Sequence, residues 1–139
     1  MRSLAIVALS LGLTPAIASA QAYQAVNDLY VVPLGGTEFE VIEGRGEGPR
    51  GIWCAAAEYA ERRLGAEDRV YIQRARGPAQ SVTGRKAVGF TINPANLSQG
   101  PFQSVSLGTD QVGVGLPVDH AIQFCRDIYD RDDSLFRRY

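Results

Sequence analysis

The sequence predicts an α+β domain: an antiparallel sheet of about five strands with two helices packed on one face, in the order ββαβββα, and one disulfide. Strand-like segments rich in β-branched and aromatic residues occur in neighbouring pairs separated by glycine-containing turns, which is typical of hairpins. Two other segments, residues 52–64 and 118–129, place apolar side chains at helical spacing. A chain of 139 residues with 45% hydrophobic residues suits one domain.

The first hairpin is expected from residues 29–32 and 37–42. Residues 29–32 are an apolar run, and residues 37–42 alternate apolar and acidic side chains. Gly35-Gly36 between these two segments is a turn signal. Residues 44–51, with sequence GRGEGPRG, contain too much glycine for a strand or helix interior, so we expect a loop.

The first helix is expected over residues 52–64, ending at Gly65. Its spacing predicts an apolar side with Trp53, Ala56, Ala57, Ala60 and Leu64, and a polar side with Glu58, Glu61 and Arg62.

The second half of the chain predicts three more strands and a helix. Residues 70–75 and 87–92 form a pair around a loop, and residues 102–107 provide a fifth strand. Pro117 is expected at the first position of a final helix over residues 118–129, with Cys125 near the middle of its apolar stripe.

Residues 1–20 have the order of a secretory signal peptide: Arg2, an apolar run over residues 4–13, then Ala18-Ser19-Ala20. The run is too short to cross a bilayer, so we expect cleavage before Gln21 and no membrane span thereafter. A single domain over residues 21–130 and a charged tail over 131–139 would remain, in the periplasm or secreted.

Cys54 and Cys125 are the two cysteines of the chain. In an oxidising compartment such a pair is most often a disulfide, which for a loop of this length stabilises by about 4 kcal/mol in the chain-entropy model. Two buried thiols or a redox pair are the alternatives, and the absence of a C-x-x-C motif argues against the latter.

Charge is segregated along the chain. Residues 21–68 carry four basic and nine acidic residues, whereas residues 69–109 carry five basic residues and no acidic one. Four of these five flank one hairpin loop and could attract a phosphate, a sulfate or an acidic glycan: Arg74, Arg76, Arg85 and Lys86. Loss of anion binding is expected from Arg74→Ala combined with Arg85→Ala. Alternatively, these side chains pair with acidic residues of or after the first helix, namely Glu58, Glu61, Glu67 or Asp68.

Arg45 and Arg50 offer a second candidate anion site, in the glycine-rich loop before the first helix. Gly46, Gly48 and Gly51 match the dinucleotide-binding pattern G-x-G-x-x-G, but the following strand lacks the acidic residue that binds a ribose hydroxyl. We therefore expect no cofactor.

A catalytic set is not evident. His120 is the sole histidine, and its neighbour Asp119 does not face it on a helix. One histidine and two cysteines make a metal centre improbable. Tyr71, Phe90 and Phe102 could stack on single-stranded nucleic acid, but their alternation with apolar neighbours favours core packing, and export argues against a nucleic-acid partner.

Four segments carry a resemblance to small exported bacterial proteins of uncharacterised function. They are WCAAAEYA at residues 53–60, RVYIQRARGP at 69–78, GRKAVGFT at 84–91 and FC at 124–125. The resemblance implies a bacterial envelope setting and a cystine link, and assigns neither a catalytic residue nor a substrate.

The sequence thus favours an exported, non-enzymatic binding or envelope-accessory domain, whose partner is an anionic glycan, a phosphate-bearing ligand or an envelope protein. One alternative is a small periplasmic enzyme using His120 or a carboxylate. Another is an inhibitor or partner-binding subunit that inserts the loop at residues 44–51.

Overall fold

The computed structural model describes residues 21–126, so the expected signal peptide and charged tail lie outside the described residues. The strands are β1 (Tyr23–Gln24), β2 (Tyr30–Gly35), β3 (Glu38–Ile42), β4 (Arg69–Pro78), β5 (Lys86–Thr91) and β6 (Gly115–Pro117). The helices are α1 (Pro49–Leu64) and α2 (Val118–Ala121), with 3-10 turns η1 (Pro94–Asn96) and η2 (Ile122–Cys125).

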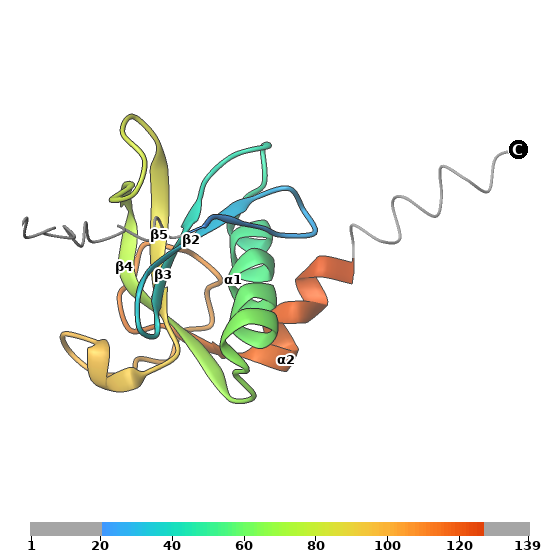
Figure 1. Cartoon of the computed structure of the whole chain (residues 1–139). Coiled ribbons are helices and arrows are strands. Elements are labelled where there is room, and N and C mark those ends of the chain that lie inside the picture. Colours follow the sequence, from blue (N-terminus) through green and yellow to red (C-terminus); the bar gives the residue numbers. More distant parts are fainter. Residues whose placement is uncertain (1–20, 127–139) are drawn as a thin grey trace, which may run out of the picture.

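The strands form one antiparallel sheet in the order β1-β2-β3-β5-β4-β6. Both expected hairpins are present: β2 pairs with β3, and β4 pairs with β5. The sheet has six strands where about five were expected, because the two-residue β1 adds to the outer edge of β2. The α+β prediction is confirmed, with α1 lying along one face of the sheet (Figure 1).

The core lies between α1 and the sheet. Phe39 of β3 stacks on Phe90 of β5 with ring centroids 5.9 Å apart, and Trp53 of α1 meets Phe90 edge-on at 5.2 Å. All three side chains are fully buried. Because side chains alternate along a strand, residues 38 and 40 of β3 point to the face away from α1.

α1 begins at Pro49, three residues earlier than expected, and ends at Gly65 in the left-handed conformation, as the glycine predicted. The expectation that Glu58 is on a solvent-facing side is wrong, since Glu58 is 4% exposed. Its carboxylate accepts hydrogen bonds from the Tyr23 hydroxyl and the Val26 amide, both at 2.8 Å, so the amino-terminal segment covers it.

The fifth strand expected over residues 102–107 is not formed. Phe102 makes only an isolated bridge to Val114 and is 53% exposed, and the strand that pairs with β4 is β6. Pro117 ends β6 and precedes α2 instead of opening the helix as its first residue. The final helix is shorter in its described part than expected, with one turn of α2 followed by η2; residues 127–129 lie outside the described residues.

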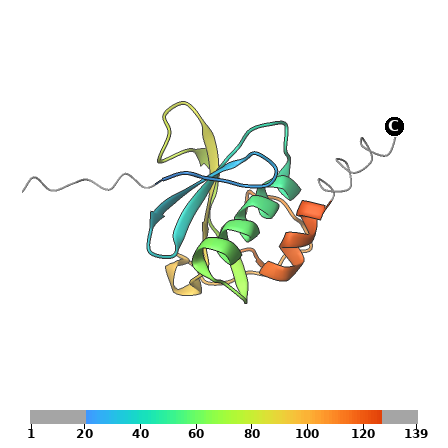
Figure 2. The ribbon, with the colours of Figure 1, turned by 45° about the vertical axis from the view of Figure 1, so that its right-hand side comes forward.

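Cys54 of α1 and Cys125 of η2 form the expected disulfide, with Cα atoms 5.1 Å apart across a sequence separation of 71. The bridge ties the carboxyl-terminal turns to the side of α1, where they lie in both views (Figures 1 and 2). Among residues 21–126, none of the helices has the length and apolar character needed to cross a membrane.

Candidate anion-binding groove

The basic hairpin of β4 and β5 contains a bulge that decides where its arginines point. Tyr71 pairs with Thr91 and Ile72 with Phe90, but the next paired residue of β4 is Arg74, opposite Gly89. The extra residue changes the alternation, so Arg74 lies on the face away from α1 instead of in the core.

Arg74 crosses β5 to reach an acidic side chain on β3. Glu40 and Arg74 both pair with Gly89, so the three residues form one row across three strands. A Cβ atom at Gly89 would lie 2.9 Å from the Arg74 Cβ atom. Glycine at this position therefore leaves the space that the arginine needs to donate from Nη2 to a Glu40 carboxylate oxygen.

The Glu40 carboxylate fastens the loop between β4 and β5 to the sheet. Besides Arg74, it accepts hydrogen bonds from the backbone amides of Gln80 at 3.0 Å and Ser81 at 2.7 Å, and from the Ser81 hydroxyl. We call this arrangement of Glu40, Arg74, Gln80 and Ser81 the Glu40 latch. Burial of Glu40 favours the neutral acid, but the donors of Ser81, Gln80 and Arg74 outweigh it and hold the pKa of Glu40 below its ordinary value.

Arg76, nearer the tip of the hairpin, is also paired. Its Nε and Nη2 atoms donate to the two carboxylate oxygens of Glu43 at 2.7 and 2.9 Å, a bidentate pair. These hydrogen bonds hold the pKa of Glu43 below its ordinary value. Arg74 and Arg76 are therefore paired, but with Glu40 and Glu43. The alternative expectation of Glu58, Glu61, Glu67 or Asp68 as partners is wrong for both.

Arg85 extends in a different direction, toward the glycine-rich loop before α1. Its Nη2 atom donates to the backbone carbonyl of Glu43 at 2.7 Å, and a Cβ atom at Gly44 would lie 3.2 Å from the same nitrogen. The loop before α1 and the loop between β4 and β5 rise at the same end of the molecule in both views (Figures 1 and 2). The two candidate anion sites of the sequence thus become neighbours.

Arg45 and Arg85 line one open groove of about 340 Å³. We call it the Arg45–Arg85 groove; its other lining residues are Asp28, Leu29, Tyr30, Ile42 and Gly44. Both arginines are exposed, and neither forms an ion pair with a carboxylate within residues 21–126. Asp28 is the acidic residue of the groove, and it accepts a hydrogen bond from the Gln24 side chain at 3.2 Å. Tyr30 is 47% exposed and offers a ring beside the two cations.

The other two basic candidates lie outside the groove. Arg50, in the first turn of α1, places its guanidinium carbon 5.6 Å from the ring centre of Phe124. Lys86 is exposed at the start of β5, close enough to Glu43 to lower the pKa of that carboxyl. Anion binding by any of the six basic residues remains a prediction.

Features considered for catalysis are dispersed. His120 is exposed on α2 with its ring 5.8 Å from that of Phe124, and it hydrogen-bonds to no nucleophile within the described residues. In residues 21–126, no three His, Cys, Asp or Glu side chains are grouped as a metal site. Of the three aromatics considered for stacking, Tyr71 and Phe90 are buried, whereas Phe102 is exposed.

A scan against protein-family models, a search of the curated proteins and a search of the solved structures found no match to this chain. Sequence reasoning identified Arg45 and Arg85 but not that they meet, and it missed Asp28 and Tyr30. The sequence offered one signal, because Asn27-Asp28 and Gly44-Arg45-Gly46 are typical turn sequences. In the structure Asp28 and Arg45 have positive φ angles of 64° and 58°.

Proposed function

We propose that this protein is an exported, non-enzymatic binding domain that holds an anionic group of its ligand in the Arg45–Arg85 groove. One observation carries the proposal. Two exposed guanidinium groups from separate loops line the same groove without a carboxylate partner among the described residues, although Arg74 and Arg76 beside them are both paired. A guanidinium presents planar N–H donors that suit phosphate, sulfate and carboxylate oxygens.

The surrounding contacts support a groove that exists before the ligand arrives. The Glu40 latch fixes the loop that leads into Arg85, and the Glu43 carbonyl fixes the Arg85 guanidinium beside Gly44. Side chains held in place lose less conformational entropy on binding, so such a groove favours affinity.

The proposal is tested by calorimetric titration at about 20 mM salt, where surface charges are weakly screened. The probes are a sulfated heparin oligosaccharide, a carboxylated oligogalacturonate and inorganic pyrophosphate, which separate a glycan source of the anion from a phosphate source. We expect at least one to bind, and Arg45→Gln combined with Arg85→Gln to weaken it by about tenfold or more.

Arg62→Gln combined with Arg126→Gln is the matched control, because it removes two exposed positive charges that neither line the groove nor belong to the six candidate residues. The control should retain most of the affinity. The proposal is overturned if none of the three anions binds the parent protein at low salt, or if the two double variants weaken binding equally, since this would indicate attraction without a site.

A further inference from the structure

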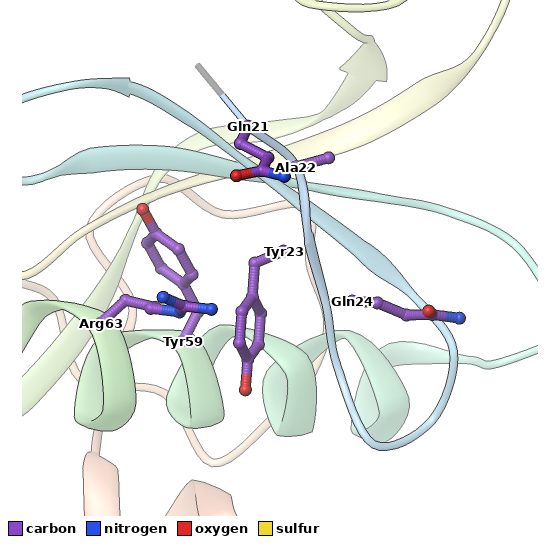
Figure 3. Close-up of a pocket in the computed structure, with 6 residues that line it drawn as sticks. All are labelled: Gln21, Ala22, Tyr23, Gln24, Tyr59 and Arg63. Atoms are coloured by element: carbon purple, nitrogen blue, oxygen red, sulfur yellow. The ribbon is translucent and has the colours of Figure 1, made fainter.

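A second pocket lies between β1 and α1 and shares no lining residue with the Arg45–Arg85 groove. It has a volume of about 490 Å³, which is within the usual range for small-molecule sites. Its lining residues are Gln21, Ala22, Tyr23, Gln24, Tyr59 and Arg63 (Figure 3). We call it the Tyr59–Arg63 pocket.

The two walls of this pocket are held together by Glu58. Its carboxylate accepts from the Tyr23 hydroxyl and from the Val26 amide, so a buried side chain of α1 fixes the segment that carries β1. Tyr23 projects from β1 toward the helix, whereas Tyr59 projects from the helix toward β1 (Figure 3). Their rings meet edge-on with centroids 5.6 Å apart.

Tyr59 brings an unused donor into the pocket. The residue is 6% exposed and its ring packs against Phe39 at 4.7 Å, yet its hydroxyl forms no hydrogen bond with the described residues. Burial raises the pKa of Tyr59, so the hydroxyl keeps its proton at neutral pH. Among the described residues, the buried polar side-chain atoms without a partner are both on Arg74, so the Tyr59 hydroxyl reaches the solvent in the pocket and can donate to a ligand there without losing a protein partner.

Arg63 supplies the charge of the pocket. Its guanidinium carbon lies 5.0 Å from the centre of the Tyr23 ring, a cation–π contact that orients the side chain without occupying its N–H donors. No carboxylate within residues 21–126 forms an ion pair with Arg63, and Glu58 pairs with the neighbouring Arg62. The pocket therefore combines the Arg63 guanidinium, the Tyr59 hydroxyl and Gln21, whose α-amino group is added by the proposed cleavage before it, whereas the Gln24 amide donates to Asp28.

We propose that the Tyr59–Arg63 pocket binds the carboxylate of a small polar molecule. A single planar guanidinium matches one planar carboxylate bidentately, whereas a phosphate dianion usually recruits more than one cation. The Tyr59 ring contacts Tyr23 and Phe39 and the residue is 6% exposed, so the ligand body contacts Gln21 and the Tyr59 hydroxyl and not an aromatic stack. This chemistry is found in sugar acids and in the carboxyl end of a short peptide.

The experiment is an NMR-monitored titration of the purified mature protein, which is expected to begin at Gln21, with two matched pairs of probes. Glucuronate is compared with neutral glucose, and N-acetylglycine with its uncharged amide. We expect one or both carboxylates to bind with a dissociation constant of about 1 mM or tighter and to shift the signals of Tyr59 and Arg63, while the neutral partners do not. If glucuronate binds more tightly, the ligand is a sugar acid; if N-acetylglycine binds more tightly, the ligand is the carboxyl end of a peptide.

Arg63→Gln should weaken this binding by about tenfold or more, and Tyr59→Phe, which removes only the hydroxyl, by a smaller factor. Arg62→Gln is the control on the same helix, since its side chain is 61% exposed and does not line the pocket. The proposal fails if neither carboxylate binds or if Arg63→Gln binds as tightly as the parent. It also fails if Arg45→Gln with Arg85→Gln abolishes the binding instead, which would assign the carboxylate to the other groove.

Discussion

A carboxylate removed from water is costly unless donors surround it, and Glu40 has four of them although it is fully buried. The Arg74 guanidinium has fewer hydrogen-bond partners than the Glu40 carboxylate. Its Nε and Nη1 atoms are buried and have no hydrogen-bond partner among the described residues. The two members of this ion pair should therefore contribute differently to stability.

We predict that Glu40→Gln lowers the free energy of unfolding by about 3 kcal/mol, because it leaves a largely buried guanidinium without its counter-charge and presents an amide to backbone donors. Arg74→Met should cost less, about 1 kcal/mol, because Gln80 and Ser81 still donate to the carboxylate. Urea denaturation of both variants measures the difference. A larger loss for Arg74→Met would contradict this account of the latch.

The lowered pKa of Glu40 predicts an acid-sensitive fold. A carboxyl whose pKa is lower in the folded chain adds stability that is complete above its unfolded pKa, about 4.3, and is lost as pH falls through the folded pKa. The melting temperature should therefore fall below about pH 5 and continue to fall through pH 3. Glu40→Gln should flatten this dependence, whereas Glu43→Gln should change it less, since Glu43 is 31% exposed. Parallel pH profiles of Glu40→Gln and the parent would be inconsistent with the latch.

At the scale of elements, the disulfide joins α1 to a segment that has little regular structure of its own. α2 has four residues and η2 another four, so neither is stable without tertiary contacts. The bridge provides a covalent contact between them and the helix that packs on the sheet.

Replacing both Cys54 and Cys125 with alanine should lower the free energy of unfolding by about 4 kcal/mol, mainly through the greater entropy of the unfolded chain. Chemical denaturation of the oxidised protein and the double variant tests this. Equal midpoints would show that the bridge does not support the fold.

The elements set by local patterns were predictable. Alternation and a Gly-Gly turn predicted the first hairpin, and β-branched and aromatic residues around a glycine-containing loop predicted the second. Helical spacing predicted α1, and the two cysteines, together with the export expected from residues 1–20, predicted the disulfide. Features set by long-range contacts were not. The bulge at Gln73 reverses the side to which Arg74 points, and nothing in the local alternation indicates it. Glu58 is polar but buried because residues far away in sequence supply its partners. Phe102 looks like a strand residue, yet most of the segment it begins pairs with nothing in the described part of the chain.

For the whole molecule, the export hypothesis predicts a definite covalent state. The protein isolated after expression with its own leader should begin at Gln21 and weigh two hydrogens less than the reduced sequence, and its cysteines should resist alkylation until reduced. Intact-mass spectrometry measures both. A chain that retains residues 1–20, or one with free thiols, would contradict export as proposed.

The proposed anion binding also depends on the whole fold, because the Arg45–Arg85 groove is lined by both the loop before α1 and the loop between β4 and β5. The most direct test is an NMR map of backbone and arginine side-chain signals during titration with pyrophosphate and the two acidic oligosaccharides at about 20 mM salt. The account predicts saturable shifts for at least one of these anions, concentrated at Tyr30, Gly44, Arg45 and Arg85. Shifts spread evenly over all exposed arginines, or none at all, would contradict it.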